Sequence, residues 1–397
     1  MKRIGLIIER HWHYGRRLCE GIAEYARTHS DWTLDFPEWS ELRDRAALSH
    51  FDGFIARIWN RAMFRALRRS ERPVVDVYGC FASEEFVAAD QDARRIGQLA
   101  ARHFIEHRFK NFAFCGYAEQ AFSTARRESF VRALKLNGFD CKVFESKVNS
   151  SERFGRKLIA RGNFDFGFDK RSLSQWLKRL EKPVAVFCAH DLLAWNVLKR
   201  CQAIGIAVPG EVSILGVDND ALLCGFTNPP LSSIDQNPFG IGYTAAEALD
   251  EWFRNPKRKP RDRRVAPAEL VERASTQVFP ITPAWLSDAL VFIRRNVNRN
   301  LNANEVFRHL GLSHTIVEKT FREKIGASVR ETIATTRIEE AKRLLERTNL
   351  SLAEICSLSG FSSKPYFTTA FNGATGMTPL QWRTAHARPS QDRTCRD

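Results

Sequence analysis

The sequence lacks the features of membrane proteins and of disulfide-stabilised secreted proteins. It has no long hydrophobic run, and its first apolar stretch covers only residues 4–8, with Gly5 inside it. That stretch is too short for a signal peptide or a membrane span. The nine cysteines form no CxxC pair and follow no regular spacing. These absences predict a cytoplasmic protein with reduced thiols and no membrane partner.

The sequence also lacks the short motifs of common enzymes. It contains no GxSxG, no Walker phosphate loop and no GxGxxG after its first predicted strand. His11 and His13 give a weak hint of a metal site, but no third or fourth ligand is near them in the sequence. We therefore expect no catalytic residues, no cofactor and no metal. A sugar-modifying enzyme with an attached DNA-binding module is the enzymatic alternative.

Positive charge is abundant and unevenly distributed. The formal net charge is +15. Residues 254–264 hold seven Lys/Arg and one Asp, and residues 285–397 hold 17 Lys/Arg and 11 Asp/Glu, so each segment contributes +6. A basic C-terminal third indicates a polyanionic partner, most often nucleic acid. A solvated basic surface explains the charge equally well.

Strand and helix patterns alternate over the first 280 residues. Continuous apolar runs, typical of strands buried on both faces, occur at 3–8, 51–57, 72–79, 111–116, 182–189 and 212–218. Helical stretches of about a dozen residues separate most of them. This alternation predicts βαβ units and parallel sheets. A last strand-like piece is expected at 265–278, before two prolines that mark a boundary.

Strand signals end near Trp285, and helical periodicity follows. In the stretch 337–348, for example, Ile338, Ala341 and Leu345 recur on one helical face. The predicted organisation is an α/β domain over 1–278, a linker over 279–284, an all-α domain over 285–388 and a disordered polar tail over 389–397.

One pattern occurs twice in the all-α part. Gly311 and Gly360 are 49 residues apart, and Phe321 and Phe371 are 50 apart. Each copy consists of a short apolar-periodic helix, a glycine that permits a turn with positive φ, and a second helix ending on the phenylalanine. This arrangement is a helix-turn-helix, whose second helix enters the DNA major groove.

The starts of the two second helices carry their own signals. Ser313 and Ser362 have the side chain of an N-cap. Pro365 falls in a first helical turn, where its missing N–H has no helical partner in any case. A single copy would be weak evidence, because many helical corners in enzymes share a glycine turn. Two copies at this spacing make DNA binding the favoured interpretation.

Residues 285–386 resemble the AraC/XylS family of transcription activators. The resemblance is carried by Gly311, Ser313, Phe321, Gly326, Arg337, Ala341, Leu344, Leu345, Ile355, Gly360, Phe361, Tyr366, Phe367, Phe371, Gly376, Thr378, Pro379 and Arg383. It implies two helix-turn-helix units on a rigid helix, which read successive major-groove segments about 34 Å apart on one face of the DNA.

The resemblance also implies which side chains face the DNA. We expect contacts from Ser313, His314, Thr315 and Glu318 in the first unit and from Ser362, Ser363, Lys364 and Thr368 in the second. The alternative for Thr368 is that it is only exposed to solvent and contacts no DNA. Lys319 and Arg322 match basic phosphate-contacting positions, whereas the second unit has Thr369 and Asn372 there. The first unit should therefore carry more of the salt-dependent affinity. Ile316 and Val317 are expected in the core.

The first 277 residues resemble the effector domain of the LacI/GalR repressors. The resemblance is carried in order by residues 87–104, 111–116, 123–134, 187–198, 208–220, 231–249 and 271–276. It implies a two-lobed domain with the periplasmic sugar-binding fold. We expect the C-terminal helix-turn-helix pair to take the place of that family's N-terminal DNA-binding headpiece. This combination resembles the bacterial xylose operon regulators.

A ligand site for a sugar follows from the second resemblance. Its positions fall on Asp90, Arg126, His190, Asp191, Asp218, Asn219 and Gln236, with Trp12, Tyr14, Phe122 and Trp195 as aromatic candidates. Carboxylates, amides and an arginine bond adjacent hydroxyls, and an aromatic face contacts the C–H side of a sugar ring. Asp191 as a helix cap and Trp195 as a core residue are the structural alternatives.

Two positions depart from the xylose regulators. Gly15 stands where they carry an acidic residue, and His190 replaces an asparagine. Xylose, another sugar or another small polar molecule is therefore the expected effector. The overall prediction is a homodimeric activator that closes its two lobes on a sugar and binds double-stranded operator DNA, with RNA polymerase a further candidate partner. A sugar-binding protein of an uptake system is the alternative.

Overall fold

The chain folds into two compact units, Met1–Gln277 and Val278–Asp397. The computed structural model describes residues 1–37, 45–79, 85–118, 120–146, 169–281 and 283–386. The predicted tail at 389–397 lies outside these residues. Within the described ranges, every helix is too short or too polar to cross a lipid bilayer.

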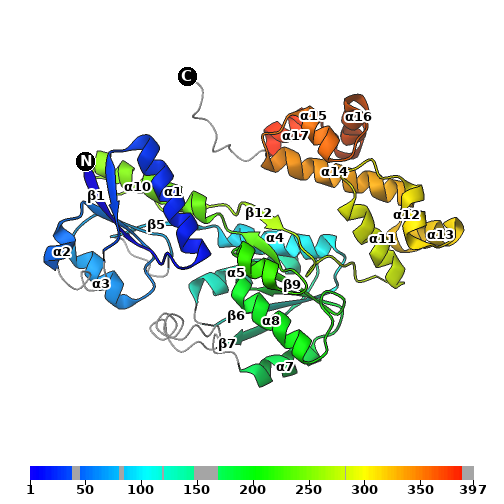
Figure 1. Ribbon diagram of the computed structural model, residues 1–397, viewed down its shortest axis with the longest axis horizontal. Coiled ribbons are helices and arrows are strands. Elements are labelled where there is room, and N and C mark those ends of the chain that lie inside the picture. The colour runs from blue at the N-terminus through cyan, green and yellow to red at the C-terminus, as the bar shows by residue number, and fades with distance from the viewer. Residues whose placement is uncertain (38–44, 80–84, 119, 147–168, 282, 387–397) are drawn as a thin grey trace. The chain divides into compact units, whose positions relative to one another are not determined.

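Two six-stranded sheets form the frame of the first unit and define its two lobes (Figure 1). The sheet of the first lobe has the order β11 (Arg263–Val265), β5 (Val87–Gln91), β4 (Val74–Asp76), β3 (Gly53–Ala56), β1 (Lys2–Ile7) and β2 (Trp32–Asp35). The sheet of the second lobe has the order β12 (Glu269–Val271), β10 (Ser232–Asp235), β9 (Val212–Val217), β8 (Val184–Cys188), β6 (Asn111–Tyr117) and β7 (Cys141–Ser146).

Strand pairing is parallel throughout both sheets, except that β12 runs antiparallel to β10. In the first lobe, Leu6 of β1 lies opposite Ile55 of β3. The chain passes between the sheets three times: after β5, between β10 and β11, and between β11 and β12. The predicted two-lobed fold with parallel sheets is confirmed. The strand expected at 265–278 is wrong in its extent, because only Glu269–Val271 within it pairs after β11 ends.

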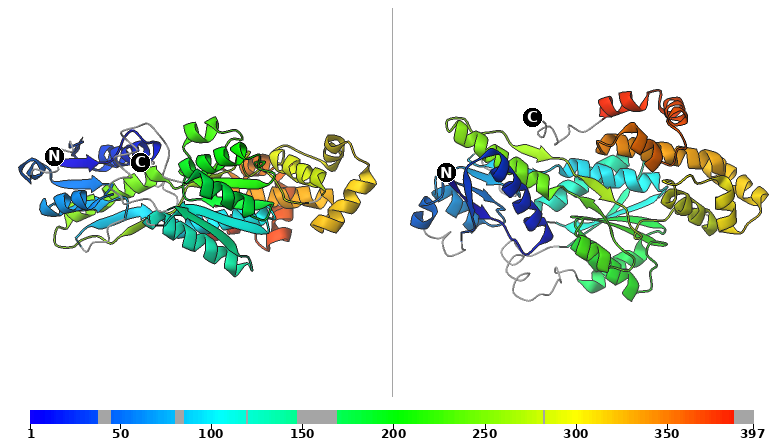
Figure 2. Two further views of the ribbon diagram at one scale, coloured as in Figure 1. Left: turned by 90° about the horizontal axis from the view of Figure 1, so that it is seen from below. Right: turned by 45° about the horizontal axis from the view of Figure 1, so that its top comes forward.

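Helices cover both sheets (Figures 1 and 2). The first lobe carries α1 (His13–His29), α2 (Arg45–Ser49), α3 (Arg61–Arg69) and α10 (Pro238–Arg254). The second carries α4 (Ala93–Glu106), α5 (Ala121–Leu136), α7 (Lys170–Arg179), α8 (Asp191–Ala203) and α9 (Ala221–Phe226). Because both faces of a sheet are covered, a central strand such as β8 is buried along its whole length, which explains its continuous apolar sequence.

The second unit is helical across its described residues. Its helices are α11 (Ala284–Arg295), α12 (Ala303–Leu310), α13 (His314–Ile325), α14 (Val329–Arg347), α15 (Leu352–Leu358), α16 (Lys364–Thr375) and α17 (Pro379–His386). One apolar core gathers Leu286, Val317 and Phe321 around the first half of α14. A second core gathers Ile355, Phe367 and Phe371 around its other half. The helix α14 therefore joins two small bundles.

The turn between the helices of each unit has the predicted left-handed glycine. Gly311 has φ 62° between α12 and α13, and Gly360 has φ 76° between α15 and α16. Phe321 and Phe371 are both completely buried, but the prediction that each helix ends on its phenylalanine is wrong, because α13 and α16 continue four residues further. Ile316 is 54% exposed, so its predicted core position is wrong. Val317, which points 100° away around the helix and lies one turn before Phe321, occupies the core instead.

The N-cap of the second recognition helix is one residue later than predicted. Ser313 caps α13 by accepting the N–H of Ile316 at 3.4 Å. The cap of α16 is Ser363 rather than Ser362, and its side chain accepts no capping hydrogen bond. The second copy contains its extra residue between Gly360 and the helix, so the residue 50 positions after Ser313 is Ser363. Pro365 lies in the first turn of α16, as predicted.

Candidate ligand site and DNA-binding surface

Most of the predicted ligand residues lie at or just beyond the carboxyl ends of parallel strands. Asp90 is the penultimate residue of β5 in the first lobe, while His190, Asp218 and Gln236 follow β8, β9 and β10 in the second. Ligands of open α/β sheets bind outside these strand ends. The two lobes thus bring polar residues from different parts of the sequence to one junction.

Arg126 connects the two lobes through its guanidinium group. Its side chain comes from α5 and is 2% exposed. Its Nε donates to Oε1 of Gln91 at 3.2 Å, and its Nη2 donates to Oε1 of Gln236 at 2.8 Å. Its Nη1 donates to the carbonyl oxygen of Ala189. Since Gln91 ends β5 of the first lobe and the other partners belong to the second, one buried cation binds both.

Asp218 extends this network in a strained backbone segment. Its Oδ1 accepts a hydrogen bond from Nε2 of Gln236. Its φ is 124° and that of Asn219 is 50°, both in the left-handed region that side chains rarely adopt. Burial, with the nearby Asp191 adding to it, raises the pKa of Asp218 to about 8. Strained residues with shifted pKa values are typical of functional sites.

Asp90 faces the same junction from the first lobe. Its Oδ1 accepts the backbone N–H of Gln91 at 2.7 Å, and its Oδ2 accepts from Nη1 of Arg264 at 3.2 Å. Burial raises the pKa of its carboxyl group to about 6. A carboxyl group that is only partly paired in a buried position is suited to bond a ligand hydroxyl.

Aromatic rings surround the arginine network. The Phe122 ring centre lies 5.3 Å from the guanidinium carbon of Arg126 and 6.1 Å from the ring of His190. His190 caps α8, and its Nδ1 accepts the N–H of Leu193 at 3.1 Å. Burial, followed by the charge of Arg126, lowers the pKa of His190 to about 3. The imidazole is therefore neutral at physiological pH, with its hydrogen on Nε2.

The two aromatic residues near the start of α1 differ in their surroundings. The Tyr14 ring centre lies 5.6 Å from the guanidinium carbon of Arg57, and burial raises the pKa of its hydroxyl well above the ordinary value. Trp12 occupies the N-cap position of α1, with its ring centre 5.2 Å from that of His11.

The remaining aromatic candidate, Trp195, lies half-buried on α8. The Lys199 amine lies 4.4 Å from its ring centre.

Two predicted ligand residues hold the turn after β9 in place. Asp191 is 1% exposed and accepts hydrogen bonds from the Ser233 hydroxyl and, at 3.1 Å, from the Asp220 N–H. Asn219 accepts from Nη2 of Arg273 at 2.8 Å. These contacts fix the strained Asp218 backbone. Asp191 is not the helix cap either, because His190 fills that position.

The structure adds residues that the sequence reasoning missed. Gln91 bonds Arg126 directly. Arg57 follows β3, pairs with Glu9 at 3.3 Å and lies 4.3 Å over the Tyr78 ring. Asp76, the last residue of β4, is 2% exposed, and burial raises its pKa to about 7. Gln91, Arg57 and Asp76 each lie at a strand's carboxyl end or one residue past it. The rule that ligands of α/β sheets bind at these strand ends could therefore have found them.

The glycine that departs from the xylose regulators has no space for a side chain. Gly15 is buried at the start of α1, where a Cβ atom would overlap the carbonyl oxygen of Glu9. The acidic side chain expected from the resemblance therefore cannot be restored here without moving the backbone.

The first recognition helix exposes most of its predicted DNA-contacting residues. Exposed positions on α13 and at its cap are Ser313, His314, Thr315, Lys319 and Arg322, while Glu318 is half-buried. The His314 ring packs on Phe307, with ring centres 3.6 Å apart. Lys319 lies 3.9 Å from Glu323 in a solvent-exposed pair, which leaves its amine accessible to a phosphate.

The second recognition helix exposes Ser362, Ser363, Lys364 and Thr368 at or near its start. It also exposes Tyr366, at 51%, in the position that Ile316 holds in the first unit. Both side chains are the third helical residue, and the sequence reasoning placed neither on the surface. An exposed apolar group at such a position can contact a thymine methyl group in the major groove.

Two arginines that carried the family resemblance serve the architecture. Arg337 on α14 donates to the carbonyl oxygen of Leu301 at 2.8 Å, and Arg383 on α17 donates to that of Leu350 at 2.6 Å. Each carbonyl lies just before the first helix of a helix-turn-helix unit. The arginines therefore fix where each unit begins.

Family profiles match both units. Residues 101–276 match the periplasmic binding protein-like domain, and residues 306–385 match a helix-turn-helix domain. The chain is 26% identical to the xylose operon regulatory protein of Escherichia coli K12 over 97% of each sequence. It is also 26% identical to that of Haemophilus influenzae, over 96% of this chain and 98% of the relative.

Solved structures give the same result. A xylose-binding transcription activator aligns with a TM-score of 0.58 at 25% identity, covering 98% of this chain and 99% of the other. A LacI family regulator from Enterococcus faecalis, solved with bound ribose, aligns with 71% of this chain at 21% identity and a TM-score of 0.54, which shows a shared fold. The expectation of a regulator rather than an enzyme is confirmed by these relatives. The chain is thus a transcription regulator that joins a periplasmic-binding-protein-like domain to a helix-turn-helix domain, similar over its whole length to the xylose operon regulatory proteins.

Proposed function

We propose that this protein activates transcription of sugar-catabolic genes when a sugar binds at the junction of its two lobes. The carrying observation is the Arg126 network, in which one buried cation bonds Gln91 of the first lobe and Gln236 of the second. A sugar hydroxyl that replaces either amide oxygen changes the contact between the lobes. Binding and lobe position are therefore coupled through the same atoms.

The proposed effector is a pentose or a sugar of similar size. Support comes from the carboxyl groups of Asp90 and Asp218, the guanidinium of Arg126 and the ring of Phe122, which together offer donors, acceptors and an apolar face. Xylose is the first candidate, because relatives over the whole chain regulate the xylose operon. The missing acidic residue at Gly15 and the neutral His190 make other pentoses and hexoses necessary members of any ligand panel.

The proposed DNA contacts come from both recognition helices. Lys319 and Arg322 would bond phosphates, while His314, Thr315, Lys364 and their exposed neighbours would reach base edges. We infer a homodimer, since a dimer presents its helix pairs to a symmetric or repeated operator. RNA polymerase would be the partner that such an activator recruits. The bacterial cytoplasm, where operator DNA lies, would be the site of action.

Calorimetry with the full-length protein and a panel of pentoses and hexoses tests the ligand assignment. One sugar should bind saturably with one site per chain, and Gln236→Ala should weaken it by about threefold to tenfold, since a neutral hydrogen bond to the sugar is lost. Saturable binding that is unaffected by Gln236→Ala would place the ligand elsewhere. Turnover of any sugar during incubation would favour the enzyme alternative.

A further inference from the structure

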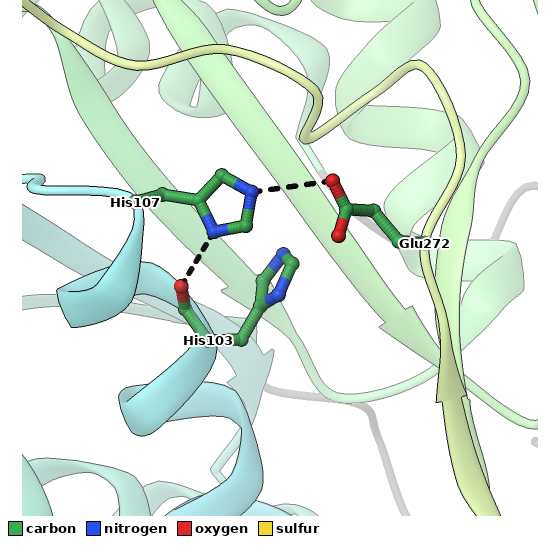
Figure 3. A group of neighbouring side chains, drawn as sticks. All are labelled: His103, His107 and Glu272. Carbon is green, nitrogen blue, oxygen red and sulfur yellow. Dashed lines mark hydrogen bonds and ion pairs between the residues drawn. The ribbon is translucent and has the colours of Figure 1, made fainter. Parts of the chain in front are cut away.

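Two histidines and a carboxylate meet where α4 packs beside the end of β12, away from the junction of the lobes (Figure 3). His103 lies in the last turn of α4 and His107 is the C-cap that directly follows the helix, so these residues, four apart, lie on one side of it. Glu272 directly follows β12. One potential ligand atom from each of the three residues lies within 4.8 Å of the others. His107 is completely buried and His103 is 5% exposed.

The hydrogen bonds of His107 fix which of its nitrogens faces the carboxylate. Its Nδ1 lies 2.7 Å from the carbonyl oxygen of His103, which can only accept, so Nδ1 carries a hydrogen. In a neutral ring the lone pair is then on Nε2, which lies 3.2 Å from Oε1 of Glu272. Two electron pairs facing each other at this distance favour a positive charge between them. A proton or a metal ion can supply it.

The donor set identifies the class of metal. Two imidazole nitrogens and one carboxylate oxygen suit Zn²⁺ and similar transition-metal ions, whereas Mg²⁺ and Ca²⁺ prefer oxygen ligands throughout. Ligand atoms around tetrahedral zinc are roughly 3.4 Å apart. The 3.2 Å between Nε2 of His107 and Oε1 of Glu272 already fits this separation, and a ligand atom of His103 lies within 4.8 Å of both residues' ligand atoms. The Nδ1 contact to a carbonyl is the usual support for a metal-binding imidazole.

We propose that His103, His107 and Glu272 bind a divalent transition-metal ion, with Zn²⁺ the first candidate. The ion would tie the segment after β12 to α4. That segment is held by the same helix, because His103 Nε2 also lies 3.1 Å from the Thr276 hydroxyl. The chain passes into the second unit at Val278. The metal would therefore fix the last residues of the sensor unit from which the DNA-binding unit departs.

Metal binding by the full-length protein tests the proposal. Chelator-treated protein is dialysed against Zn²⁺ alone and analysed for bound metal, and Co²⁺ is added as a spectroscopic probe. One ion per chain should bind, with the visible absorption of four-coordinate Co²⁺. Glu272→Gln and His107→Gln should weaken binding by about tenfold to a hundredfold or more. His50→Gln, an exposed histidine far from the three ligands in the sequence, should bind like the parent protein.

Circular dichroism shows whether each variant is folded. If His107→Gln does not fold, Glu272→Gln decides, because this side chain is 21% exposed, and the substitution keeps its shape and removes only the charge. Absence of bound Zn²⁺ and Co²⁺ in the parent protein would overturn the proposal. Equal affinity in parent and folded Glu272→Gln would also overturn it, because the ion would then bind elsewhere, such as at His11 and His13.

Discussion

The two units of this protein place their functional side chains in opposite environments. In the sensor unit the polar groups are buried: Arg126 and Gln236 are 2% and 4% exposed, and burial raises the pKa values of Asp90 and Asp218. In the DNA-binding unit they lie on the surface, where Lys319 and Lys364 are exposed to solvent. A small ligand is enclosed by its site, whereas DNA is a large external surface.

This difference separates what holds each unit together from what makes it function. In the sensor, the residues of the proposed ligand site also connect the lobes, so a change there should alter stability and binding together. In the DNA-binding unit, glycine turns, capping residues and phenylalanine cores hold the fold, while the recognition residues contribute little to it. The predictions below test this separation.

The largest effect is expected from Gly360→Ala in the second helix-turn-helix. The substitution combines a left-handed φ of 76° with overlap of the new Cβ and the carbonyl oxygen of Val297. We expect a loss of about 3–5 kcal/mol in the free energy of unfolding. Gly311→Ala is the matched control, because its φ is 62° but no atom lies within 4 Å of the added Cβ. It should cost about 1–2 kcal/mol. Equal costs in denaturant unfolding would show that the contact with Val297 is unimportant.

Arg126→Met should reduce both the stability of the sensor and its sugar affinity. Removing the guanidinium leaves the Gln91 and Gln236 oxygens and the Ala189 carbonyl without this donor, at a cost of about 2–4 kcal/mol. Arg132, on the same helix α5, is exposed, so Arg132→Met should cost about 0.5 kcal/mol or less and leave sugar binding intact. Calorimetry and thermal unfolding of both variants measure this. A stable Arg126→Met protein that binds sugar normally would show that the Arg126 hydrogen bonds support neither stability nor sugar binding.

The two lysines of the recognition helices should separate affinity from specificity. Lys319→Ala removes a phosphate contact, so it should weaken operator and random DNA equally and reduce the slope of log affinity against log salt by about 0.9. Lys364→Ala should cost about 1–3 kcal/mol on operator DNA alone. Fluorescence anisotropy over a salt series distinguishes them. An unchanged salt slope for Lys319→Ala would refute its phosphate role.

A smaller effect is expected from pH. Burial raises the pKa of Asp218 to about 8 and of Asp90 to about 6, whereas both are near 3.9 in an unfolded chain. The folded sensor thus retains these protons to higher pH, and its stability should fall as pH rises from about 4 to about 8. Asp218→Asn should reduce the difference in melting temperature between pH 5 and pH 8, while Asp169→Asn, at the exposed N-cap of α7, should not. A melting temperature that rises over this range in the parent protein would contradict the assignment.

The sequence was most informative where function depends on short-range patterns. Gly311 and Gly360 have the predicted left-handed turns, and Phe321 and Phe371 the predicted burial, because helix period and turn chemistry are local. The prediction placed Ile316 in the core, but only the neighbouring Val317 is buried, because an apolar residue can also lie on the surface. It placed the N-cap at Ser362 instead of Ser363, because the loop of the second copy contains one extra residue.

The sensor site depends on long-range placement, so the sequence predicted it less completely. The family resemblance proposed Arg126 and Gln236 as ligand residues, but Gln91, 35 residues before Arg126, joins them only through the crossing of the chain between sheets. Asp191 has the residue type of a ligand contact, yet its partners are Ser233 and the Asp220 backbone. The pair His103 and His107 went unnoticed because its carboxylate partner is 165 residues from the second histidine.

The central claim is that ligand binding in the sensor changes the affinity of the helix-turn-helix units for DNA. The most direct measurement is the affinity of the full-length protein for an operator selected from random duplexes, with and without the sugar that calorimetry identifies. The account predicts a change of about 5- to 150-fold, the usual range of coupling between two sites. A sugar that saturates the sensor and leaves operator affinity unchanged would contradict it.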